Sequence, residues 1–386
     1  MSFNGSAIVS LLDGAVSNGI LHGVAAVAVS RDGQLFHHAA GEAGERSLFR
    51  NASMTKAVAT TAALQLVERG LLSLDATVES ILPEFGRLSV LEGFDGGRPL
   101  LRAPASRATV RQLVTHTAGF GYFFLNEKLR RYHSSTGVPT QFSGSRRCLI
   151  APMVNDPGTA WEYGGSTDWL GRVVEAVSGQ RLGDFLRQNI YGPLGMVDST
   201  FAPSEEQRAR MMRVMQRQPD GSLVTSPYDF PAAPDWDAAG HGSYGTVQDY
   251  GRFIQAWLND GEPILGPATA AAAFHDQLSP LTLPTSISTV APELSNDMHA
   301  LPVPRTWGLG FHLVLADLPG MRRRGTGDWA SLFNSYYWID RSTGVGGVLM
   351  TQLLPFFDAS TLELLMGFEA AVYQQLGGIA ATTVHR

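Results

Sequence analysis

The sequence predicts an α+β fold, an α/β sandwich in which one antiparallel, five-stranded sheet is built from both chain ends and flanked by helices. Three patterns predict it: an apolar hairpin near the N-terminus, about three apolar runs near the C-terminus, and helical spacing over much of the middle. Neither end alone can bury a sheet face, so one shared sheet beneath the first and last helices is the economical arrangement. The middle of the chain then forms a mostly helical inserted domain.

The N-terminal region predicts a surface helix followed by a hairpin and a second helix. The inward face of the first helix is formed by Ile8, Val9, Leu12 and Val16. The two apolar runs that follow flank residues 31–33, where an Asp-Gly pair supplies the positive φ that hairpin turns need. Residues 53–68 again have helical spacing, and the helix is expected to stop at Gly70.

The rest of the chain predicts helices first and strands afterwards. Three helical patterns precede the C-terminal strands, at 168–177, at 182–190, and at 246–261 with Thr246 as N-cap and Gly261 as stop. The expected strands then cover 307–316, 331–340 and 345–354, and the expected last helix covers about 360–375.

The chain length allows two domains or lobes. Residues 70–157 are rich in loops and short helices, and we expect them to form a small helical domain. Residues 1–69 and 158–386 would then form the α/β sandwich domain that carries the sheet and the helix starting near Ser53. No internal repeat or low-complexity tract is evident.

Composition excludes several classes of function. The net charge of −6 provides no basic surface for nucleic acid. No run of eighteen apolar residues is present, so we expect no membrane partner. The N-terminus lacks a basic region and carries Asp13 within its apolar stretch, which favours a cytoplasmic protein. The single cysteine, Cys148, excludes a disulfide framework and is expected to be a buried, inert thiol.

Ser53 and Lys56 form the first candidate catalytic pair. Only two lysines occur among 29 basic residues, and one of them follows a serine by three positions. Positions i and i+3 share a helix face, so the two side chains can touch. A serine hydroxyl needs a neighbouring base, and lysine can serve if burial or a nearby cation lowers its pKa, whereas arginine cannot be deprotonated. The N-terminal end of the helix adds N–H groups where an oxyanion would form.

A Ser-x-x-Lys pair alone is a weak signal, but further motifs accompany it in this chain. The segments TVRQLVTHTAGFGY, AWEYGGSTDWLG, NIYGPLGMVDSTF, GHGSYGTVQDYGRF and GTGDWASLFNSYYWID follow Ser53-Met54-Thr55-Lys56 in order. This succession resembles the serine hydrolases of the class C β-lactamase type, a superfamily that includes penicillin-binding DD-peptidases and family VIII carboxylesterases. The resemblance covers nearly the whole chain and is closest to the family VIII enzymes.

The resemblance implies a β-lactamase/transpeptidase-like fold, with the site between an antiparallel five-stranded sheet and a helical domain. It implies that Ser53 attacks an ester or lactam carbonyl. Tyr163, held near Lys56, would accept the serine proton and return it to the leaving group. A phenol becomes a usable base when an ammonium lies beside its oxygen.

The lactamase pattern has a third element, Lys-Thr-Gly on an edge strand, and two alignments of this chain compete for it. The segment 325–327 is Gly-Thr-Gly and lacks the lysine, while counting back from Asp340 places Trp329-Ala330-Ser331 there. Family VIII esterases commonly carry Trp-Gly-Gly at this point, so the second alignment is preferred. The oxyanion hole carried over with it consists of the backbone N–H groups of Ser53 and Leu332.

Two departures from the lactamases favour an ester substrate. Lactamases carry Tyr-x-Asn where this chain has Tyr163-Gly164-Gly165, and the edge-strand lysine is missing. Both losses remove groups expected to hold the antibiotic, so a neutral acyl substrate is preferred. The resemblance therefore implies a serine carboxylesterase that hydrolyses short-chain or small-molecule esters through an acyl-enzyme.

Further candidates are less specific. Tyr122, Phe123 and Phe124 are expected to wall an acyl pocket, although an ordinary core cluster explains them equally well. His241 lies where the family places a loop facing the site. His116 is expected to tie a turn, and Asp328 is expected to be a solvated charge rather than a rim residue.

Several other classes of function compete with the esterase. The Gly-x-Ser-x-Gly elbow of α/β-hydrolases and the His-Glu-x-x-His signature of zinc hydrolases are absent from the sequence. An amide hydrolase, a β-lactamase or an acyltransferase on the same scaffold remains open, because all of them form an acyl-enzyme. A non-catalytic penicillin-recognition module would not need Ser53, Lys56 and Tyr163 together. We expect no cofactor and no metal, and the oligomeric state is left open.

Overall fold

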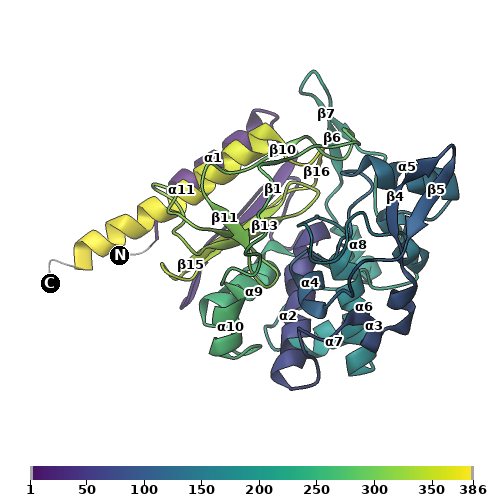
Figure 1. Cartoon of the computed structure of the whole chain (residues 1–386). Coiled ribbons are helices and arrows are strands. Elements are labelled where there is room, and N and C mark those ends of the chain that lie inside the picture. Colours follow the sequence, from purple (N-terminus) through teal and green to yellow (C-terminus); the bar gives the residue numbers. More distant parts are fainter. Residues whose placement is uncertain (1–2, 384–386) are drawn as a thin grey trace.

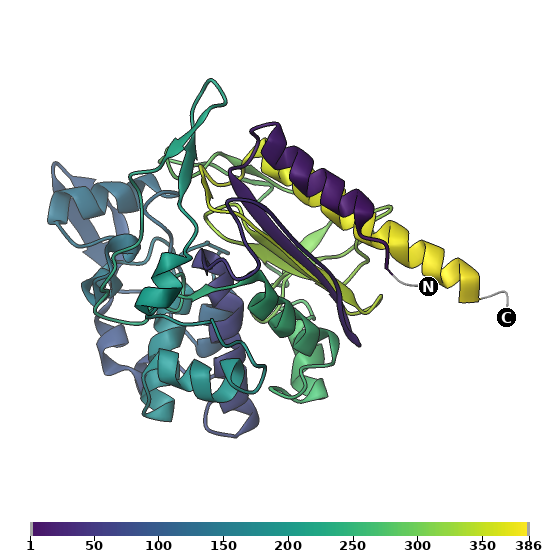
Figure 2. The same cartoon turned by 180° about the vertical axis from the view of Figure 1, so that it is seen from behind.

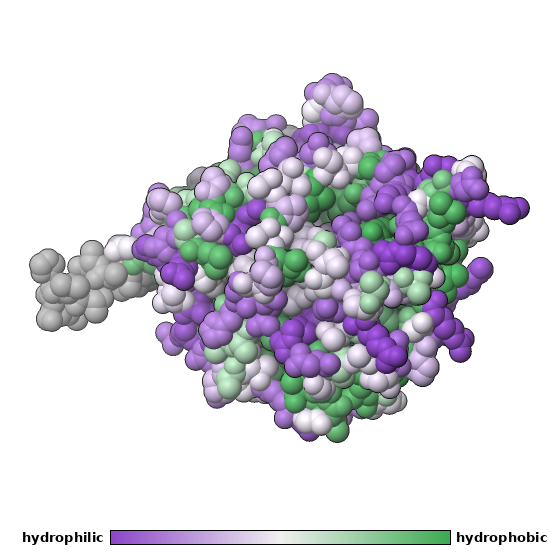
Figure 3. Space-filling model, in the orientation of Figure 1, coloured by the Kyte–Doolittle hydropathy of each residue, from purple (hydrophilic) through white to green (hydrophobic). Residues whose placement is uncertain are grey.

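The computed structural model describes residues 3–383, and the side chains of the last helix as far as residue 377. A sheet with helices on both faces lies beside a predominantly helical part, and the first and last described residues lie toward the same end of the sheet (Figure 1). On the face drawn in Figure 3, hydrophobic residues lie in several separate groups among hydrophilic ones. None of the helices among the described residues is both long enough and apolar enough to cross a membrane.

The central sheet has seven antiparallel strands in the order β11-β12-β13-β14-β15-β1-β2. These are β1 (Gly23–Ser30), β2 (Gly33–Gly41), β11 (Arg305–Trp307), β12 (His312–Val314), β13 (Gly327–Ala330), β14 (Tyr336–Asp340) and β15 (Val345–Met350). The N-terminal strand β1 pairs directly with β15, from Ala25 opposite Met350 to Ser30 opposite Val345. The expectation that both chain ends build one sheet is therefore confirmed.

Helices cover both faces of this sheet. On one face, α1 (Ser6–Ser17) and α11 (Ala359–Thr383) lie side by side, as Figure 2 shows, and α9 (Val247–Leu258) covers the other. Strand β1 is buried along nearly its whole length because alternate side chains enter the two layers. This double burial explains why its sequence is continuously apolar rather than alternating.

The number of strands differs from the prediction of five. The run 307–316 was expected to be one strand, but it turns back at Gly308–Phe311 and forms β11 and β12. Gly310 has φ +89°, and a Cβ there would lie 2.8 Å from the Thr60 side chain, so only glycine allows this turn. Similarly, residues 331–334 were expected to be strand, but Ser331 N–H donates to Ser335 O at 2.7 Å and closes a turn.

The helical part is built around α2 (Thr55–Glu68), which follows a short 3₁₀ turn at Ala52–Met54. Every residue from Thr55 to Leu66 is buried, and helix α6 (Ser166–Ser178) packs along α2. As the sequence indicated, the chain leaves the helix at Gly70, which has φ +69°. The other helices of this part are α3 (Val78–Ile81), α4 (Val110–Val114), α5 (Glu127–Thr136) and α7 (Leu182–Leu186).

Two other helix predictions can be compared with the structure. The segment predicted as a helix at 182–190 is α7 followed by a π-turn at Arg187–Tyr191. Thr246 caps α9 as expected, because its hydroxyl accepts from Asp249 N–H at 3.1 Å. The division into domains at residues 70 and 157 stays a prediction.

Short elements complete the chain. The remaining helices are α8 (Glu205–Ala209), α10 (Pro267–Ala273) and the 3₁₀ turns Pro83–Arg87, Gln141–Ser143 and Arg146–Ile150. The remaining strands are β3 (Phe49–Arg50), β4 (Val90–Asp95), β5 (Arg98–Arg102), β6 (Met215–Arg217), β7 (Leu223–Thr225), β8 (Tyr244–Gly245), β9 (Ser286–Ile287), β10 (Met298–His299) and β16 (Leu353–Leu354).

Candidate active site

Ser53 lies on the 3₁₀ turn that leads into α2, at the junction of the sheet and the helical part. The preceding residue, Ala52, has φ +41°, a conformation that a non-glycine residue adopts only where its surroundings hold it. Those surroundings include Ser243, whose hydroxyl accepts from Asn51 Nδ2 at 3.0 Å and bonds Thr55 Oγ1 at 2.8 Å. The nucleophile candidate is therefore fixed from both sides along the chain.

Lys56 is 2% exposed and lies one helical turn after Ser53. Its Nζ donates to Ser53 Oγ at 3.0 Å, to Tyr122 OH at 2.9 Å and to Gly240 O at 2.7 Å. These three acceptors match the three hydrogens of an ammonium group. The i, i+3 spacing of the sequence thus brings the hydroxyl and the amine into direct contact.

Tyr163 lies on the loop before α6, with its ring over the same amine. Lys56 Nζ is 4.9 Å from the ring centroid, and the Tyr163 hydroxyl accepts from Trp329 Nε1 at 3.0 Å. A Cβ on Gly164 would lie 2.2 Å from Phe120 O, so a glycine is needed for the loop to pass there. The structure therefore brings the predicted serine, lysine and tyrosine together.

Burial shifts the two proton-carrying groups in opposite directions. It lowers the pKa of Lys56, and the nearby carboxylate of Asp168 opposes that change. It raises the pKa of Tyr163, and hydrogen bonds with Ser53 and Trp329 oppose that change. The amine is therefore the group that gives up its proton first, and the phenol is the group that keeps it.

Asp168 is a site residue that the sequence analysis missed. It is 0% exposed, its Oδ1 accepts from Gly240 N–H at 2.8 Å, and burial raises its pKa despite Lys56 nearby. Gly240 thus links the carboxylate and the amine through its N–H and its C=O. The only signal in the sequence was an acid in the first turn of α6, which is an ordinary place for a solvated aspartate.

Tyr122 and Phe123 do not occupy the place that the sequence analysis gave them. Neither is among the described residues that line the cavity beside Ser53, whereas their neighbour Phe124 is. Tyr122 is buried and points its hydroxyl at Lys56, while Phe123 packs its ring against Phe142. The segment forms a turn closed by a hydrogen bond from Leu125 N–H to Tyr122 O at 3.1 Å, and one residue of the three reaches the cavity.

Trp329 lies on β13 and closes the other side of the site. Besides the hydrogen bond to Tyr163, the Trp329 ring packs against the ring of Trp307, with 4.7 Å between the ring centroids. Strand β13 is not an edge strand, because β12 and β11 continue the sheet beyond it. The competing residue Thr326 is buried and donates to Arg323 O at 2.7 Å, away from the cavity lining.

The predicted oxyanion hole pairs Ser53 with Leu332, which lies in the turn after β13. Both residues line the same cavity. Within the described part of the chain, neither backbone N–H has a hydrogen-bond acceptor. An oxyanion hole requires two unpaired donors beside the reacting carbon, and the assignment stays a prediction.

The two histidine candidates are both buried. His241 lines the cavity between the rings of Phe142 and Phe230, and burial together with Lys56 lowers its pKa to about 3. His116 has φ +57°, and its carbonyl accepts from Glu162 N–H at 2.9 Å, in keeping with its predicted place in a turn. His116 also lies against the ring of Tyr163, with 5.2 Å between centroids.

Asp328 is not the solvated charge that the sequence analysis favoured. A 2.7 Å hydrogen bond joins it to His312 Nδ1, and Arg322 binds its other oxygen. Burial raises the pKa of Asp328, but His312 and Arg322 lower it more, so the net shift is downward. Cys148 is buried, as expected.

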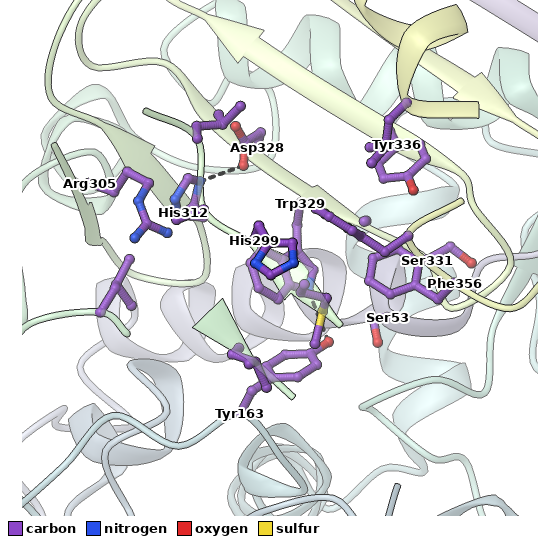
Figure 4. A pocket seen from close by; sticks show the side chains of 18 of the residues that line it. Ser53, Tyr163, His299, Arg305, His312, Asp328, Trp329, Ser331, Tyr336 and Phe356 are labelled. Atoms are coloured by element: carbon purple, nitrogen blue, oxygen red, sulfur yellow. Dashed lines mark hydrogen bonds and ion pairs between the residues drawn. The ribbon is translucent and has the colours of Figure 1, made fainter. Parts of the chain in front are cut away.

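A cavity of about 460 Å³ opens beside Ser53. Phe142, Trp161, Tyr163 and His241 form its wall near the serine, and it extends past Trp329 to α11. In Figure 4, Ser53 and Tyr163 lie below Trp329 and His299, and Arg305 and His312 lie to the left of them. Most of the lining is apolar, which suits a hydrophobic substrate.

The sequence matches known proteins over nearly its whole length. Residues 13–368 match the family Beta-lactamase. The chain is 33% identical over 338 residues to monacolin J acid methylbutanoyltransferase of Aspergillus terreus, which covers 84% of this chain and 82% of the relative. It is 30% identical over 386 residues to lovastatin esterase of Penicillium rubens, which covers 94% of this chain and 96% of the relative.

A similar solved structure is a mutant of simvastatin synthase from Aspergillus terreus. It superimposes with a TM-score of 0.86 at 29% sequence identity, and the match covers 95% of this chain and 96% of that one. The resemblance stated from the sequence motifs is thereby confirmed at the level of family and fold class.

Proposed function

Because the chain belongs to the beta-lactamase family and is an enzyme of the serine hydrolase or acyltransferase type, we propose that it is a carboxylesterase acting through an acyl group held on Ser53. The observation that carries the proposal is the contact of Lys56 Nζ with Ser53 Oγ at 3.0 Å beneath the ring of Tyr163. Its placement among the family VIII carboxylesterases is part of the proposal.

In the proposed acylation step, Lys56 accepts the proton of Ser53 as the oxygen attacks the ester carbonyl. A neutral amine has two hydrogens and one lone pair. Tyr122 OH and Gly240 O take the two hydrogens, which leaves the lone pair for Ser53. This differs from the expectation that Tyr163 is the acceptor, and the opposite pKa shifts of the two groups support the change.

Tyr163 then acts as the acid in this proposal. Its hydroxyl protonates the leaving alkoxide as the ester C–O bond breaks, and the proton held by Lys56 passes to the tyrosinate. In the second step, water or an alcohol gives its proton to the same relay while it attacks the acyl carbonyl. Ser53 recovers its proton and the acyl group leaves, so the cycle is balanced.

The backbone N–H groups of Ser53 and Leu332 would stabilise the oxyanion in both steps. Removing one such donor costs about 100- to 1,000-fold in other serine hydrolases. The Trp329 indole would hold Tyr163 in place, and the Asp168 carboxylate would hold Lys56 near the serine while burial disfavours its charge. These two are positioning residues.

Esters are preferred over lactams for two reasons. Strand β13 carries Trp329 where a lactamase has lysine, and Gly165 replaces the asparagine amide. The cavity beyond Ser53 is apolar and large enough for a bulky acyl or alcohol group. These features support a hydrophobic ester as the substrate class.

Transfer to an alcohol is the second candidate, and the relatives favour it. One is named as a methylbutanoyltransferase of monacolin J acid and another as a lovastatin esterase. Both names fit an acyl-enzyme whose acyl group reaches either an alcohol or water. We propose that this chain partitions its acyl group between the two, according to the occupancy of the apolar cavity.

Substitution of the nucleophile tests the proposal. Ser53→Ala should abolish hydrolysis of p-nitrophenyl butyrate, because Ser53 both contacts Lys56 Nζ through its hydroxyl and lines the cavity, whereas Tyr122, whose hydroxyl also contacts Lys56, does not line it. Ser17→Ala, an exposed serine on α1, is the matched control and should retain full activity. Full hydrolysis by a folded Ser53→Ala protein would refute the proposal.

A panel of substrates separates the related activities. Wild type and Ser53→Ala would be assayed with esters, amides and nitrocefin, with and without a hydrophobic alcohol as acceptor. We expect esters to exceed lactams in kcat/KM and the alcohol to divert part of the acyl group into a new ester. A stoichiometric burst without turnover on every substrate would instead indicate a penicillin-recognition module.

A further inference from the structure

The charged groups of the cavity are nearly all paired with one another. Arg322 Nη2 and Nε bond to Glu369 at 2.5 and 2.9 Å, and Arg322 also binds Asp328. Asp328 in turn bonds to His312 at 2.7 Å. The remaining charged side chain of the lining is Arg305, on β11.

Arg305 has no carboxylate partner among the described residues. Its Nη2 donates to Pro284 O at 3.1 Å, and its other guanidinium nitrogens have no acceptor in the described part of the chain. The side chain is half-buried, and burial lowers its pKa, opposed by the already bonded Asp328. Most N–H donors of this guanidinium therefore have no protein acceptor among the described residues, and the side chain lines the cavity.

The surroundings of Arg305 are apolar. Leu283, Ile287, Leu301, Leu318 and Met321 line the same cavity. In Figure 4 Arg305 and Ser53 lie on opposite sides of Trp329 and His299, and the Arg305 guanidinium points into the cavity. An apolar wall offers a guanidinium few other partners, and a guanidinium fits a carboxylate through two parallel hydrogen bonds.

We propose that Arg305 is a specificity residue that binds a carboxylate of the substrate, so that the enzyme prefers hydrophobic esters carrying a remote negative charge. The inference rests on the proposed function, because it names the substrate class of the same site. The carboxylate can belong to the acyl group or to the alcohol part of the ester. Both sources share the same chemistry at Arg305.

Paired substrates test the inference and distinguish the two sources. For the acyl side, mono-p-nitrophenyl esters of glutaric, adipic and suberic acid are compared with the alkanoate esters of equal length. For the alcohol side, 4-butyryloxybenzoate is compared with 4-butyryloxybenzamide. The quantity measured is the ratio of kcat/KM for the charged over the neutral member of each pair.

Three variants carry the test. Arg305→Met should lower that ratio by about tenfold to 100-fold for the pair whose carboxylate reaches the guanidinium. Arg305→Lys should restore part of it, because the charge remains while the bidentate geometry is lost. Arg324→Met, an exposed arginine outside the cavity lining, should leave the ratio unchanged.

The outcomes are distinct. An equal loss on charged and neutral esters in Arg305→Met would mean that Arg305 only ties the loop at Pro284, and the inference would be wrong. A wild-type enzyme with no preference for either charged ester would overturn it as well. If the wild-type enzyme hydrolysed no ester of the panel, the proposed function itself would be wrong. Failure of the inference about Arg305 can therefore be told apart from failure of the proposed function.

Discussion

The amine of Lys56 is held where its charge is disfavoured, yet three oxygens surround it. Arginine could not do the same work, because it stays protonated in proteins. The sequence predicted the contact with Ser53 from spacing alone. It could not predict the role of Asp168 or the bond between Tyr122 and Lys56, because burial of a polar side chain beside a distant lysine depends on how α2, α6 and the loop before Gly240 pack.

The pH dependence of the reaction follows from this placement. Since burial lowers the pKa of Lys56, its neutral form is present well below the usual lysine pKa of about 10.4. Activity should rise as pH increases through the lowered pKa, because below it the amine is protonated and cannot accept the serine proton. A profile of log kcat/KM against pH with p-nitrophenyl butyrate measures the inflection.

Lys56→Met tests the assignment of that inflection. The variant should lose about 100- to 10,000-fold in kcat/KM, and the inflection due to the lysine should disappear. The fold is checked by circular dichroism. A variant that kept the wild-type pH profile would assign the inflection to another group.

At the level of elements, helices and hairpins with strong local signals were predicted well. Thr246 caps α9 and the Asp-Gly turn joins β1 to β2, because both depend on neighbouring residues. The run at 307–316 was misassigned because its break depends on contacts of Gly310 with Thr60 on a distant helix. The strand at β13 was placed only through its resemblance to family motifs.

The ion pair of Glu369 with Arg322, which joins α11 to the sheet, should contribute strongly to stability. Glu369 on α11 is buried against Arg322, which also holds Asp328 on β13. Glu369→Met should lower the free energy of unfolding by about 3–5 kcal/mol, because it leaves a buried guanidinium short of its partner. Urea denaturation followed by tryptophan fluorescence measures this.

Glu363→Met provides the matched control on the same helix. Glu363 is exposed, and the described residues include no ion-pair partner for it, so its replacement should change stability by less than about 0.5 kcal/mol. Equal effects of the two substitutions would show that the Glu369 contact contributes no more than a surface charge.

At the level of the whole molecule, the fold class could be predicted because strand-forming and helix-forming segments are separated along the chain. The pairing of β1 with β15 joins residues more than 300 positions apart. The entropy cost of closing so long a loop is offset by the burial of apolar side chains on both faces of the sheet. The division into domains is harder to infer, since α6 and α4, which come from both sides of the expected boundary, pack together.

Amide hydrogen exchange should report this uneven distribution of burial. Strands β1 and β15 are fully enclosed, so their amides should exchange only through global unfolding. The hairpin β4–β5 has exposed or half-buried side chains apart from Val90 and Leu91, and it should exchange much sooner. Mass spectrometry of peptic peptides measures both, and faster exchange in β1 than in β4–β5 would contradict the expectation.

The position of Trp329 on a late strand has a consequence for protein synthesis. On the ribosome, Ser53, Lys56 and Tyr163 emerge long before β13 can be flanked by β12 and β14. Until those strands are translated, the phenol lacks its indole partner and the cavity lacks one wall. We therefore expect the proposed ester cleavage to begin only after β12, β13 and β14 have been translated.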